Sequence, residues 1–323
     1  MSSPLQITIL GTFVADLAFR ADRLPTWGET VLGSAFRMGP GGKGSNQAVA
    51  AARLGASVSI ISKVGLDEFG NIARRTWADE GIDTRFVIDT AEFETGSSTI
   101  TVNETTGDNA IVVVPGSGFR ITRGEVELAR DAIAESAIFM TCLELPMDVV
   151  RHGLALAMSL GVRTILNPAP AQLLADDIYP LCDYFTPNES EATRLTGVTV
   201  MNAETAEHAA DVLLSRGARH VIVTLGEGGA LVKTAKVTAH VAAFRAGAVV
   251  ETTGAGDAFN GGLAVALAEG KEILDAVRFG CAAAGICVTR LGSTPAMPTR
   301  HEVAVLAGTG NEASNAILFK SPR

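Results

Sequence analysis

Short runs of apolar, β-branched residues recur along this chain and alternate with segments of helical periodicity. The runs contain few polar interruptions, which is typical of strands buried on both faces of a parallel sheet. They lie at residues 7–10, 58–62, 137–140, 163–166, 184–186 and 220–225. Alternating strands and helices predict an α/β fold with a doubly wound, mainly parallel sheet flanked by helices.

Two of the predicted helices are marked by their ends as well as by their periodicity. In residues 203–216, alanine and leucine recur every three or four positions, and Gly217 follows as a helix stop. Thr122 and Glu125 have the spacing of a capping box, which predicts a helix that continues through Ala134.

Two segments break the alternation, because they contain strand patterns with no helix between them. The first covers about residues 14–38. The second covers about residues 99–114 and predicts a hairpin with its turn at residues 104–108. We expect these segments to form a small β-sheet that projects from the main sheet. The chain is expected to be one domain, residues 1–323, with a polar and weakly structured end after Pro298.

One glycine-rich stretch, Gly254-Ala255-Gly256-Asp257, leads into an apolar segment that predicts a buried helix at residues 258–268. Small residues at the beginning of a helix let backbone N–H groups approach an anion, which the helix dipole also favours. The carboxylate could be an ordinary helix cap. Because it would also repel an anion bound at this turn, we favour a catalytic role for Asp257.

A second glycine-rich stretch covers residues 39–47 and is followed by another apolar segment. A dinucleotide-binding fingerprint would follow the first strand directly, but that strand lies about thirty residues upstream. A Walker A loop would have Ser or Thr after its lysine, whereas Lys43 is followed by Gly44. Two alternatives remain: a plain turn before a helix, and a loop in which Lys43 and Asn46 contact a polar ligand.

Composition limits the partners and the compartment. The 323-residue chain has a formal net charge of −9, which argues against nucleic acid as a partner. The four cysteines form no C-x-x-C pair, so we expect reduced thiols. No apolar run reaches the ~20 residues that a membrane-spanning helix needs, and the first residues do not have a signal-peptide pattern. We therefore expect a soluble, cytoplasmic protein that binds neither nucleic acid nor membranes.

The two glycine-rich stretches, in this order and spacing, closely resemble the N-terminal and C-terminal signatures of the ribokinase family of carbohydrate kinases, also called PfkB. Further similar blocks begin at Pro25, Asn167, Thr186, Thr224 and Val288. The resemblance extends from about Ile7 to about Pro298. It implies a ribokinase-like fold in which the small sheet is a lid over the sugar and paired lids form a homodimer.

The resemblance implies an ATP-dependent sugar kinase, with D-ribose phosphorylated at its 5-hydroxyl as the expected reaction. A kinase for 2-deoxyribose, another sugar or a nucleoside is an alternative, and a non-catalytic sensor of sugar or nucleotide is an alternative of another class. Asp257 is implied as the general base. The amides of Gly254, Ala255 and Gly256 are implied to stabilise the transferring phosphoryl group. An intact base counts against the sensor.

The resemblance also assigns the binding residues. Those for the sugar are Asp16, Gly42, Lys43, Asn46, Glu144 and Asp257. Those for ATP are Asn188, Thr224, Gly226, Gly229 and Gly256. Asn188 and Glu191 are implied to organise Mg²⁺, largely through water, although their spacing also fits a capping box. Glu251, Thr253, Arg290 and Gly292 are implied to bind a monovalent cation, K⁺.

The chain departs from the family pattern at two places. Val14 stands where ribokinases typically have an asparagine that contacts the sugar, and valine cannot form that hydrogen bond. This departure leaves the identity of the sugar open. Glu251 stands where aspartate is usual, and Ala296 where a serine often supplies an oxygen. This second departure leaves the degree of activation by K⁺ open.

Overall fold

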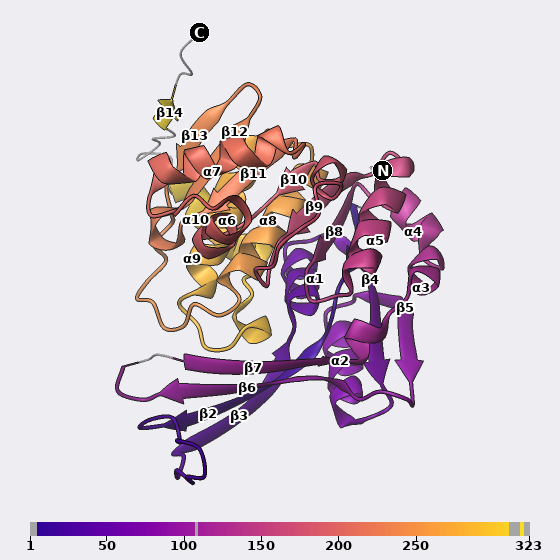
Figure 1. The fold of residues 1–323 in the computed structure, drawn as a ribbon, viewed down its shortest axis with the longest axis vertical. Coiled ribbons are helices and arrows are strands. Elements are labelled where there is room, and N and C mark those ends of the chain that lie inside the picture. Colours follow the sequence, from indigo (N-terminus) through magenta and orange to yellow (C-terminus); the bar gives the residue numbers. More distant parts are fainter. Residues whose placement is uncertain (1–4, 107–108, 310–316, 320–323) are drawn as a thin grey trace.

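The computed structural model describes residues 5–106, 109–309 and 317–319 of the chain. Within this part, the main sheet consists of β1 (Gln6–Leu10), β4 (Ser57–Gly65), β5 (Asp83–Thr90), β8 (Ile138–Cys142), β9 (Arg163–Asn167), β10 (Tyr184–Phe185), β11 (His220–Thr224), β12 (Ala230–Thr234), β13 (Thr238–Val241) and β14 (Ile317–Phe319). Their order is β14-β13-β12-β11-β10-β9-β8-β1-β4-β5 (Figure 1). The strands from β11 to β5 in this order are parallel, and β12, β13 and β14 extend one edge in antiparallel pairing.

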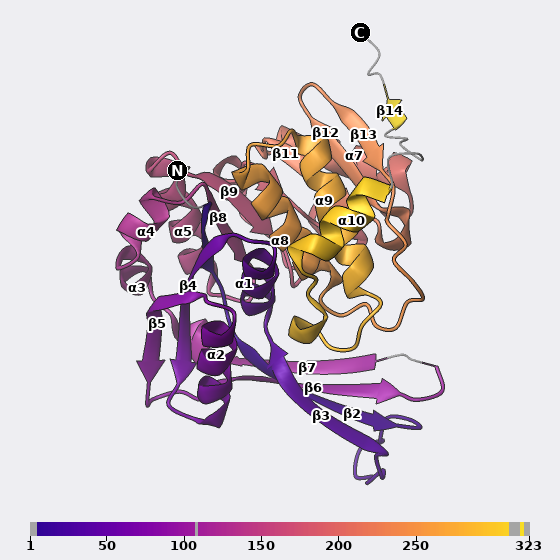
Figure 2. The ribbon, with the colours of Figure 1, turned by 180° about the vertical axis from the view of Figure 1, so that it is seen from behind.

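Helices cover both faces of this sheet, which confirms the predicted α/β fold. One face carries α1 (Lys43–Arg53), α2 (Glu68–Asp79), α8 (Ala255–Ala268), α9 (Ile273–Cys287) and α10 (Arg300–Thr309), seen in front in Figure 2. The other carries α3 (Arg123–Glu127), α4 (Arg130–Ala134), α5 (Met147–Ser159), α6 (Glu189–Thr196) and α7 (Ala203–Ser215). Each helix layer packs on the sheet through its own apolar core. The central strands are mostly apolar because both of their faces are buried. No helix of the described residues is long and apolar enough to cross a membrane.

The structure corrects two of the predicted elements. The helix that begins after Thr122 has its capping box but does not run unbroken to Ala134, because α3 ends at Glu127 and α4 begins at Arg130. Between them the Ala129 N–H donates to the Val126 carbonyl three residues back at 3.0 Å, a tighter turn than an α-helix makes.

The stretch after Pro298 was predicted to have little regular structure, and this prediction was wrong. It contains α10 and the edge strand β14, which pairs with β13. The helix begins where the Thr299 hydroxyl and N–H both donate to the Glu302 carboxylate at 2.8 Å. This Thr-x-x-Glu pattern is a capping box that the sequence analysis passed over.

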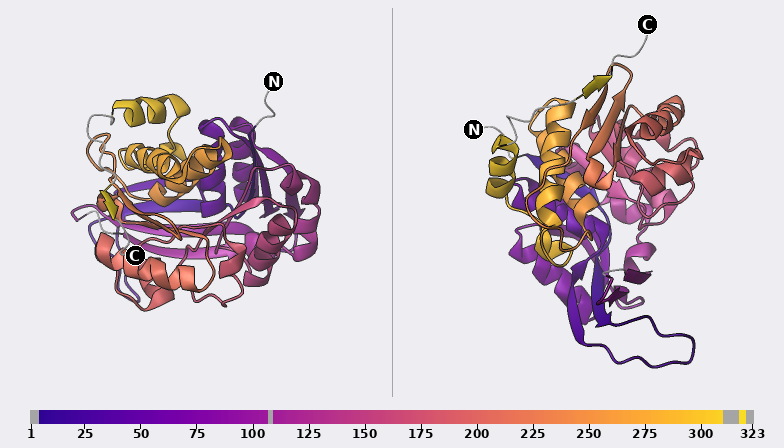
Figure 3. Two further views of the ribbon diagram at one scale, coloured as in Figure 1. Left: turned by 90° about the horizontal axis from the view of Figure 1, so that it is seen from above. Right: turned by 90° about the vertical axis from the view of Figure 1, so that its left-hand side faces the viewer.

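A second, four-stranded sheet projects from the main body (Figures 1 and 3). It consists of β2 (Val14–Ala21), β3 (Ala35–Gly41), β6 (Thr95–Asn103) and β7 (Asn109–Gly116), in the order β3-β2-β6-β7. We call this sheet the lid. Strands β6 and β7 are antiparallel, as the predicted hairpin requires, but residues 107–108 of its predicted turn lie outside the described residues. Strand β2 follows β1 after three residues, so the lid grows from the carboxyl end of a central strand.

Candidate active site

Two cavities lie at the carboxyl ends of the parallel strands, where open α/β sheets bind ligands. The lid cavity, of about 400 Å³, is lined by the lid strands, the start of α1 and the segment after β8. The loop cavity, of about 610 Å³, is lined by the loop after β11, residues 243–249, and α8 and α9. The start of α8 borders both: Gly254 and Asp257 face the lid cavity, whereas Ala255 and Gly256 face the loop cavity. One helix N-terminus is therefore accessible from both sides.

The backbone at the start of α8 requires small residues. Gly254 has φ of 83°, in the left-handed region, and a Cβ on it would lie 3.1 Å from the Ser293 Cα. The Ala255 N–H donates to the Thr252 carbonyl at 3.2 Å. The N–H groups of Gly254, Gly256 and Asp257 have no acceptor among the described residues. The sequence analysis assigned the amides of Gly254, Ala255 and Gly256 to the phosphoryl group. In the described structure the Asp257 amide is free and the Ala255 amide is not.

Asp257 is held in the first turn of α8 by two side chains of α1. The Asn46 amide donates to Oδ2 at 2.9 Å, and the Gln47 amide donates to Oδ1 at 3.0 Å. The carboxylate is only 5% exposed. Burial raises the pKa of Asp257 to about 6, although the nearby Lys43 ammonium and these hydrogen bonds lower it. At neutral pH it is an ionised carboxylate that is readily protonated, which suits a general base.

The second glycine-rich stretch is also a helix start. Helix α1 begins at Lys43, earlier than the apolar segment alone indicates, so Lys43 and Asn46 lie in its first turns. Gly42 has φ of 86°, and a Cβ there would lie 2.7 Å from the Thr12 carbonyl oxygen. A Cβ on Gly44 would lie 2.4 Å from the Gly11 Cα. These contacts explain the glycines, because they let the start of α1 pack against the chain leaving β1.

Glu144, after β8, caps this helix. Its Oε2 accepts the Lys43 backbone N–H at 2.8 Å and the Thr12 hydroxyl at 2.7 Å. Burial lowers the pKa of the Lys43 side chain, but the carboxylates of Asp257 and Glu144 offset this effect and raise its pKa above the ordinary value. The lid cavity therefore has a permanent positive charge between two carboxylates.

Asp16 lies on the lid and faces the same cavity. Its carboxylate accepts the Ser98 hydroxyl at 2.7 Å and the Ser293 hydroxyl at 3.1 Å. Burial raises its pKa, although the two hydroxyls lower it. A Cβ on Gly41 would lie 2.2 Å from Asp16 Oδ2, so this position of the motif leaves room for the carboxylate. Val14, which is 3% exposed, adds an apolar patch to the wall next to it.

The loop cavity is mostly apolar. Thr224, Gly226 and Gly229, all predicted for this site, line one side. Gly229 has φ of 91°, and a Cβ there would lie 2.1 Å from the Val241 carbonyl oxygen. The other walls are formed by residues that the sequence analysis did not assign: Phe244, Arg245, Val249, Phe259, Ala284 and Val288. Such a cavity suits a flat aromatic group with its polar end at the start of α8.

The predicted pair Asn188 and Glu191 forms a complete capping box on α6. The Asn188 side chain accepts the Glu191 N–H at 2.9 Å, and the Glu191 carboxylate accepts the Asn188 N–H at 2.9 Å. The capping interpretation is thus confirmed. Among the described residues that line either cavity, neither of the two is found. Glu191 is 5% exposed, and burial raises its pKa.

The segment predicted to bind a monovalent cation joins two loops. Glu251 accepts the Gly292 N–H at 2.8 Å, which ties the loop before α8 to the loop after α9. The carbonyl oxygens of Thr253, Arg290 and Gly292 accept no hydrogen bond from the described part of the chain. Ala296 is fully buried and supplies no oxygen from its side chain. Three carbonyl groups are therefore available to a cation, but the Glu251 carboxylate is already engaged.

Several contacts of this site have no counterpart in the sequence analysis. Gln47 is the last residue of the second glycine-rich stretch and follows Asn46, which was assigned to the site. Its position in that stretch could therefore have indicated a role for it. Ser98, Ser293 and Thr294 lie outside the assigned motifs, and only the folded chain brings them to Asp16 and Asn46. A lone Ser or Thr in a strand or turn carries no signal of this kind.

Comparisons with known proteins show which family and fold this chain is similar to. The family described as pfkB family carbohydrate kinase matches residues 5–300. A ribokinase of Haemophilus influenzae is 40% identical, covering 92% of this chain and 96% of the relative. A deoxyribokinase of Salmonella typhi is 34% identical, covering 91% of this chain and 96% of the relative. Among solved structures, ribokinase of Arabidopsis thaliana complexed with ribose and ATP matches with a TM-score of 0.87 at 28% identity, covering 94% of this chain and 99% of that one.

Proposed function

This chain belongs to the pfkB family of carbohydrate kinases, and we propose that it transfers the γ-phosphoryl group of ATP to the 5-hydroxyl of D-ribose. The observation that carries the proposal is the position of the α8 N-terminus between two cavities. A phosphoryl group held there would have the nucleotide on one side and the accepting hydroxyl, next to Asp257, on the other. In-line transfer requires this arrangement.

The lid cavity suits a sugar with several hydroxyls. Asp16, Lys43, Asn46 and Glu144 provide donors and acceptors on one side, and the lid provides apolar contacts through Ile100 and other residues. About 400 Å³ is room for a pentose. The relatives named ribokinase support ribose as the pentose.

Asp257 accepts the proton of the attacking hydroxyl in this proposal. Its two oxygens are oriented by Asn46 and Gln47, so the carboxylate is fixed before the substrate binds. The free N–H groups of Gly254, Gly256 and Asp257 would stabilise the negative charge that develops on the phosphoryl oxygens. A lid closed over the bound sugar would keep water out of the cavity and limit wasteful hydrolysis of ATP.

ATP would occupy the loop cavity with its base between the apolar walls near Phe244 and Val288. Mg²⁺ would come with the nucleotide and neutralise charge on its phosphates. The family resemblance assigns Asn188 and Glu191 to this ion, and because neither is among the described residues that line the two cavities, they would act on it through water. Both Glu191 oxygens already accept a hydrogen bond from Asn188, so the water ligands would use the remaining lone pairs of this carboxylate.

A monovalent cation, K⁺, would bind the carbonyl oxygens of Thr253, Arg290 and Gly292. Their lack of hydrogen-bond donors within the described residues supports this assignment. Because Glu251 already bonds the Gly292 N–H, the loops are partly ordered without the ion. We therefore expect weaker activation by K⁺ than in a kinase that uses a full set of side-chain ligands.

A homodimer through the lid would cover an exposed apolar face. Residues alternate along the lid strands, so Ile111 and Val113 line the cavity while their neighbours point away from it. The opposite face carries Phe19, Phe36, Met38, Val112 and Val114, which are 40%, 58%, 45%, 69% and 57% exposed. Such a face on a projecting sheet fits a second copy of the chain.

The four free cysteines are buried, as expected for a protein of the reducing cytoplasm.

A kinase for 2-deoxyribose is the second candidate, and Val14 favours it. Its buried apolar side chain lines the lid cavity beside Asp16, where it cannot bond a hydroxyl but can contact a carbon that lacks one. The deoxyribokinase is 34% identical to this chain, which is close to the 37% of a ribokinase of Bacillus subtilis.

The decisive experiment is an assay of ADP release with a panel of D-ribose, 2-deoxyribose, other pentoses, hexoses and nucleosides. The proposal predicts turnover with ribose and a phosphate ester at its 5-position, checked by NMR of the product. A preference for another member of the panel would replace ribose as the substrate. ATP turnover with none of them would favour a sensor of sugar or nucleotide.

A further inference from the structure

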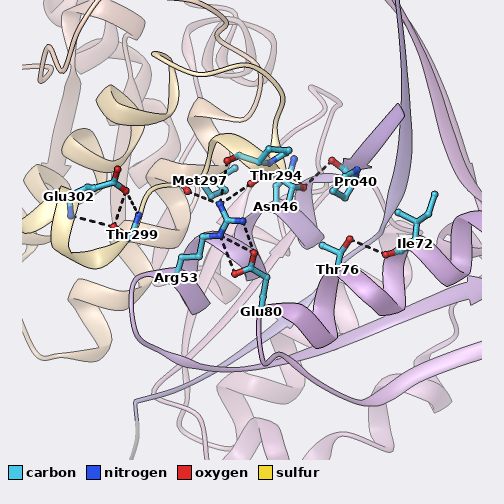
Figure 4. Close-up of polar contacts among 11 residues, drawn as sticks. Pro40, Asn46, Arg53, Ile72, Thr76, Glu80, Thr294, Met297, Thr299 and Glu302 are labelled. Atoms are coloured by element: carbon cyan, nitrogen blue, oxygen red, sulfur yellow. Dashed lines mark hydrogen bonds and ion pairs between the residues drawn. The ribbon is translucent and has the colours of Figure 1, made fainter. Parts of the chain in front are cut away.

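Thr294, in the 3₁₀-helix η4 (Thr294–Ala296), is linked to Asp257 through one side chain. The Thr294 hydroxyl donates to Asn46 Oδ1 at 2.6 Å, and Asn46 Nδ2 donates to Asp257 Oδ2 at 2.9 Å. Figure 4 shows Thr294 beside Asn46 and Pro40. All three linked side chains are buried, at 2%, 4% and 5% exposure. The Pro40 carbonyl is a second acceptor for the hydroxyl, but it is farther away at 3.0 Å.

The direction of these hydrogen bonds matters for the Asn46 amide. An amide has a donating NH₂ end and an accepting oxygen end, and the two differ little in shape. Only the NH₂ end stabilises an ionised carboxylate. A hydroxyl that donates to the oxygen end therefore fixes the end that faces Asp257. Without this donor, Asn46 has a buried oxygen with no partner and loses the contact that sets its orientation.

Thr294 is itself held from the side opposite to the cavity. Arg53, at the end of α1, donates through Nη1 to the carbonyl oxygens of Thr294 at 3.4 Å, Pro295 at 3.3 Å and Met297 at 2.8 Å (Figure 4). Its Nη2 pairs with Glu80, after α2, at 2.6 Å. Because η4 is anchored to the ends of two helices, the position of the Thr294 hydroxyl does not depend on a bound ligand.

We infer that Thr294 is a positioning residue, which orients the Asn46 amide so that Asp257 stays ionised and aligned for proton abstraction. The inference deepens the proposed function and rests on Asp257 as the base. Thr294 lines neither cavity among the described residues, so it would act only through Asn46. Removal of its hydroxyl should change the titration of Asp257 without removing a substrate contact.

Other groups also influence the titration of Asp257, and a substitution at Thr294 leaves these groups in place. They are Lys43 on α1, Glu144 after β8, Glu191 on α6, and the thiols of Cys142 and Cys287. None of these groups bonds Thr294 in the described structure. A difference in titration between the wild type and a Thr294 variant thus reports the link through Asn46.

The test compares Thr294→Val, which has the same shape but no hydroxyl, with Thr294→Ser, which keeps the hydroxyl. We expect kcat of Thr294→Val at pH 7 to fall about three- to tenfold, the loss of one buried hydrogen bond. The acid limb of its pH–rate profile should move upward by about half a pH unit, because ionised Asp257 is less stabilised. KM for ATP should not change, and Thr294→Ser should restore both properties.

Two control variants separate positioning from stability. The Thr76 hydroxyl donates to the Ile72 carbonyl within α2 at 2.9 Å, and the Thr299 hydroxyl donates to Glu302 at 2.8 Å (Figure 4). Thr76→Val and Thr299→Val should lower the melting temperature slightly and leave the pH–rate profile where it is. If Thr294→Val behaves like them, with a lower melting temperature and an unmoved profile, Thr294 is merely structural and the inference is wrong.

A direct titration makes the result independent of turnover. The Asp257 carboxyl can be followed by ¹³C NMR of protein with labelled aspartate and identified by its absence in Asp257→Asn. We expect its midpoint to be higher in Thr294→Val than in the wild type and in Thr294→Ser. Should the wild type phosphorylate nothing while the midpoint still moves, the proposed function fails and the positioning stands. An active wild type with an unmoved midpoint overturns the positioning alone.

Discussion

The Asn46 amide on α1 donates to the Asp257 carboxylate on α8 at 2.9 Å, across 211 residues of sequence. This contact joins the two glycine-rich stretches, since each of them starts one of the two helices. It also connects the wall of the lid cavity with the helix N-terminus that borders both cavities. The chemistry of the site therefore depends on how these two helices pack.

The pH dependence should reflect Asp257. Burial raises its pKa to about 6, so kcat/KM for the sugar should be flat above pH 7 and fall as the pH drops through about 6. A rate profile in a constant-ionic-strength buffer measures this directly. A profile that stays flat down to pH 5 would contradict an essential carboxylate with a raised pKa.

The raised pKa of Asp257 also predicts how the free energy of unfolding changes with pH. Because the folded state binds the Asp257 proton more tightly than the unfolded state does, this group makes the folded protein relatively more stable as the pH falls from about 6 toward the ordinary range of aspartate. In Asp257→Asn this contribution disappears. The wild type should consequently gain stability relative to Asp257→Asn between pH 7 and pH 5, measured as the free energy of unfolding in urea titrations.

Specificity should depend on residue 14. Asparagine in place of Val14 adds a group that can bond a sugar hydroxyl, worth roughly 0.5–1.5 kcal/mol net. We expect Val14→Asn to raise the ratio of kcat/KM for ribose over 2-deoxyribose by about two- to tenfold. The control is the conservative Val14→Ile, which adds no hydrogen-bonding group and should leave the preference unchanged. An unaltered ratio in Val14→Asn would exclude this residue as a determinant of specificity.

Much of this site could be predicted from sequence because motifs report local backbone geometry. Gly42 and Gly254 both have positive φ, and each precedes a helix whose first turns carry the chemistry. The position of Asp257 next to Asn46 could not be read from either motif alone. The resemblance to a family assigned both residues to the sugar site, but it did not predict the hydrogen bond between them.

What could not be predicted involves single polar residues brought together only by folding. Thr294 reaches Asn46 across 248 residues, and Ser98 reaches Asp16 across 82. A threonine or serine without a periodic pattern gives no such signal. The missed helix α10 is different: Thr299 and Glu302 form a capping box directly before an apolar run at residues 303–307, so the sequence did contain a signal for this helix.

Activation by K⁺ should be present but modest. The carbonyl groups of Thr253, Arg290 and Gly292 are free to bind the ion within the described structure, whereas Glu251 is engaged with the Gly292 N–H. Titration of KCl against a large inert cation at fixed ionic strength measures the effect on kcat. Strong activation with tight half-saturation would show that carbonyl ligands are enough and that Glu251 does not pre-order the loop.

The lid face should determine the oligomeric state. Phe36 is 58% exposed and contacts Phe19, with ring centroids 4.9 Å apart, on the face that points away from the cavity. We expect Phe36→Asp to be monomeric by light scattering after gel filtration, where the wild type is a dimer. Leu173→Asp, at a site 72% exposed outside the lid, is the matched control and should remain dimeric. A monomeric wild type would refute the proposed dimer.

The most direct test of the account is Asp257→Asn. Asparagine keeps the size of the side chain and its ability to cap a helix, but it cannot take the proton of the sugar hydroxyl. Asp275→Asn is the control, because Asp275 is an exposed acid in the first turn of α9. We expect kcat of Asp257→Asn to fall by about 10²–10⁴-fold, with ATP affinity and melting temperature retained, and Asp275→Asn to be as active as the wild type. An Asp257→Asn protein that keeps its kcat but loses stability would give Asp257 a structural role through Asn46 and Gln47 and contradict its role as the base.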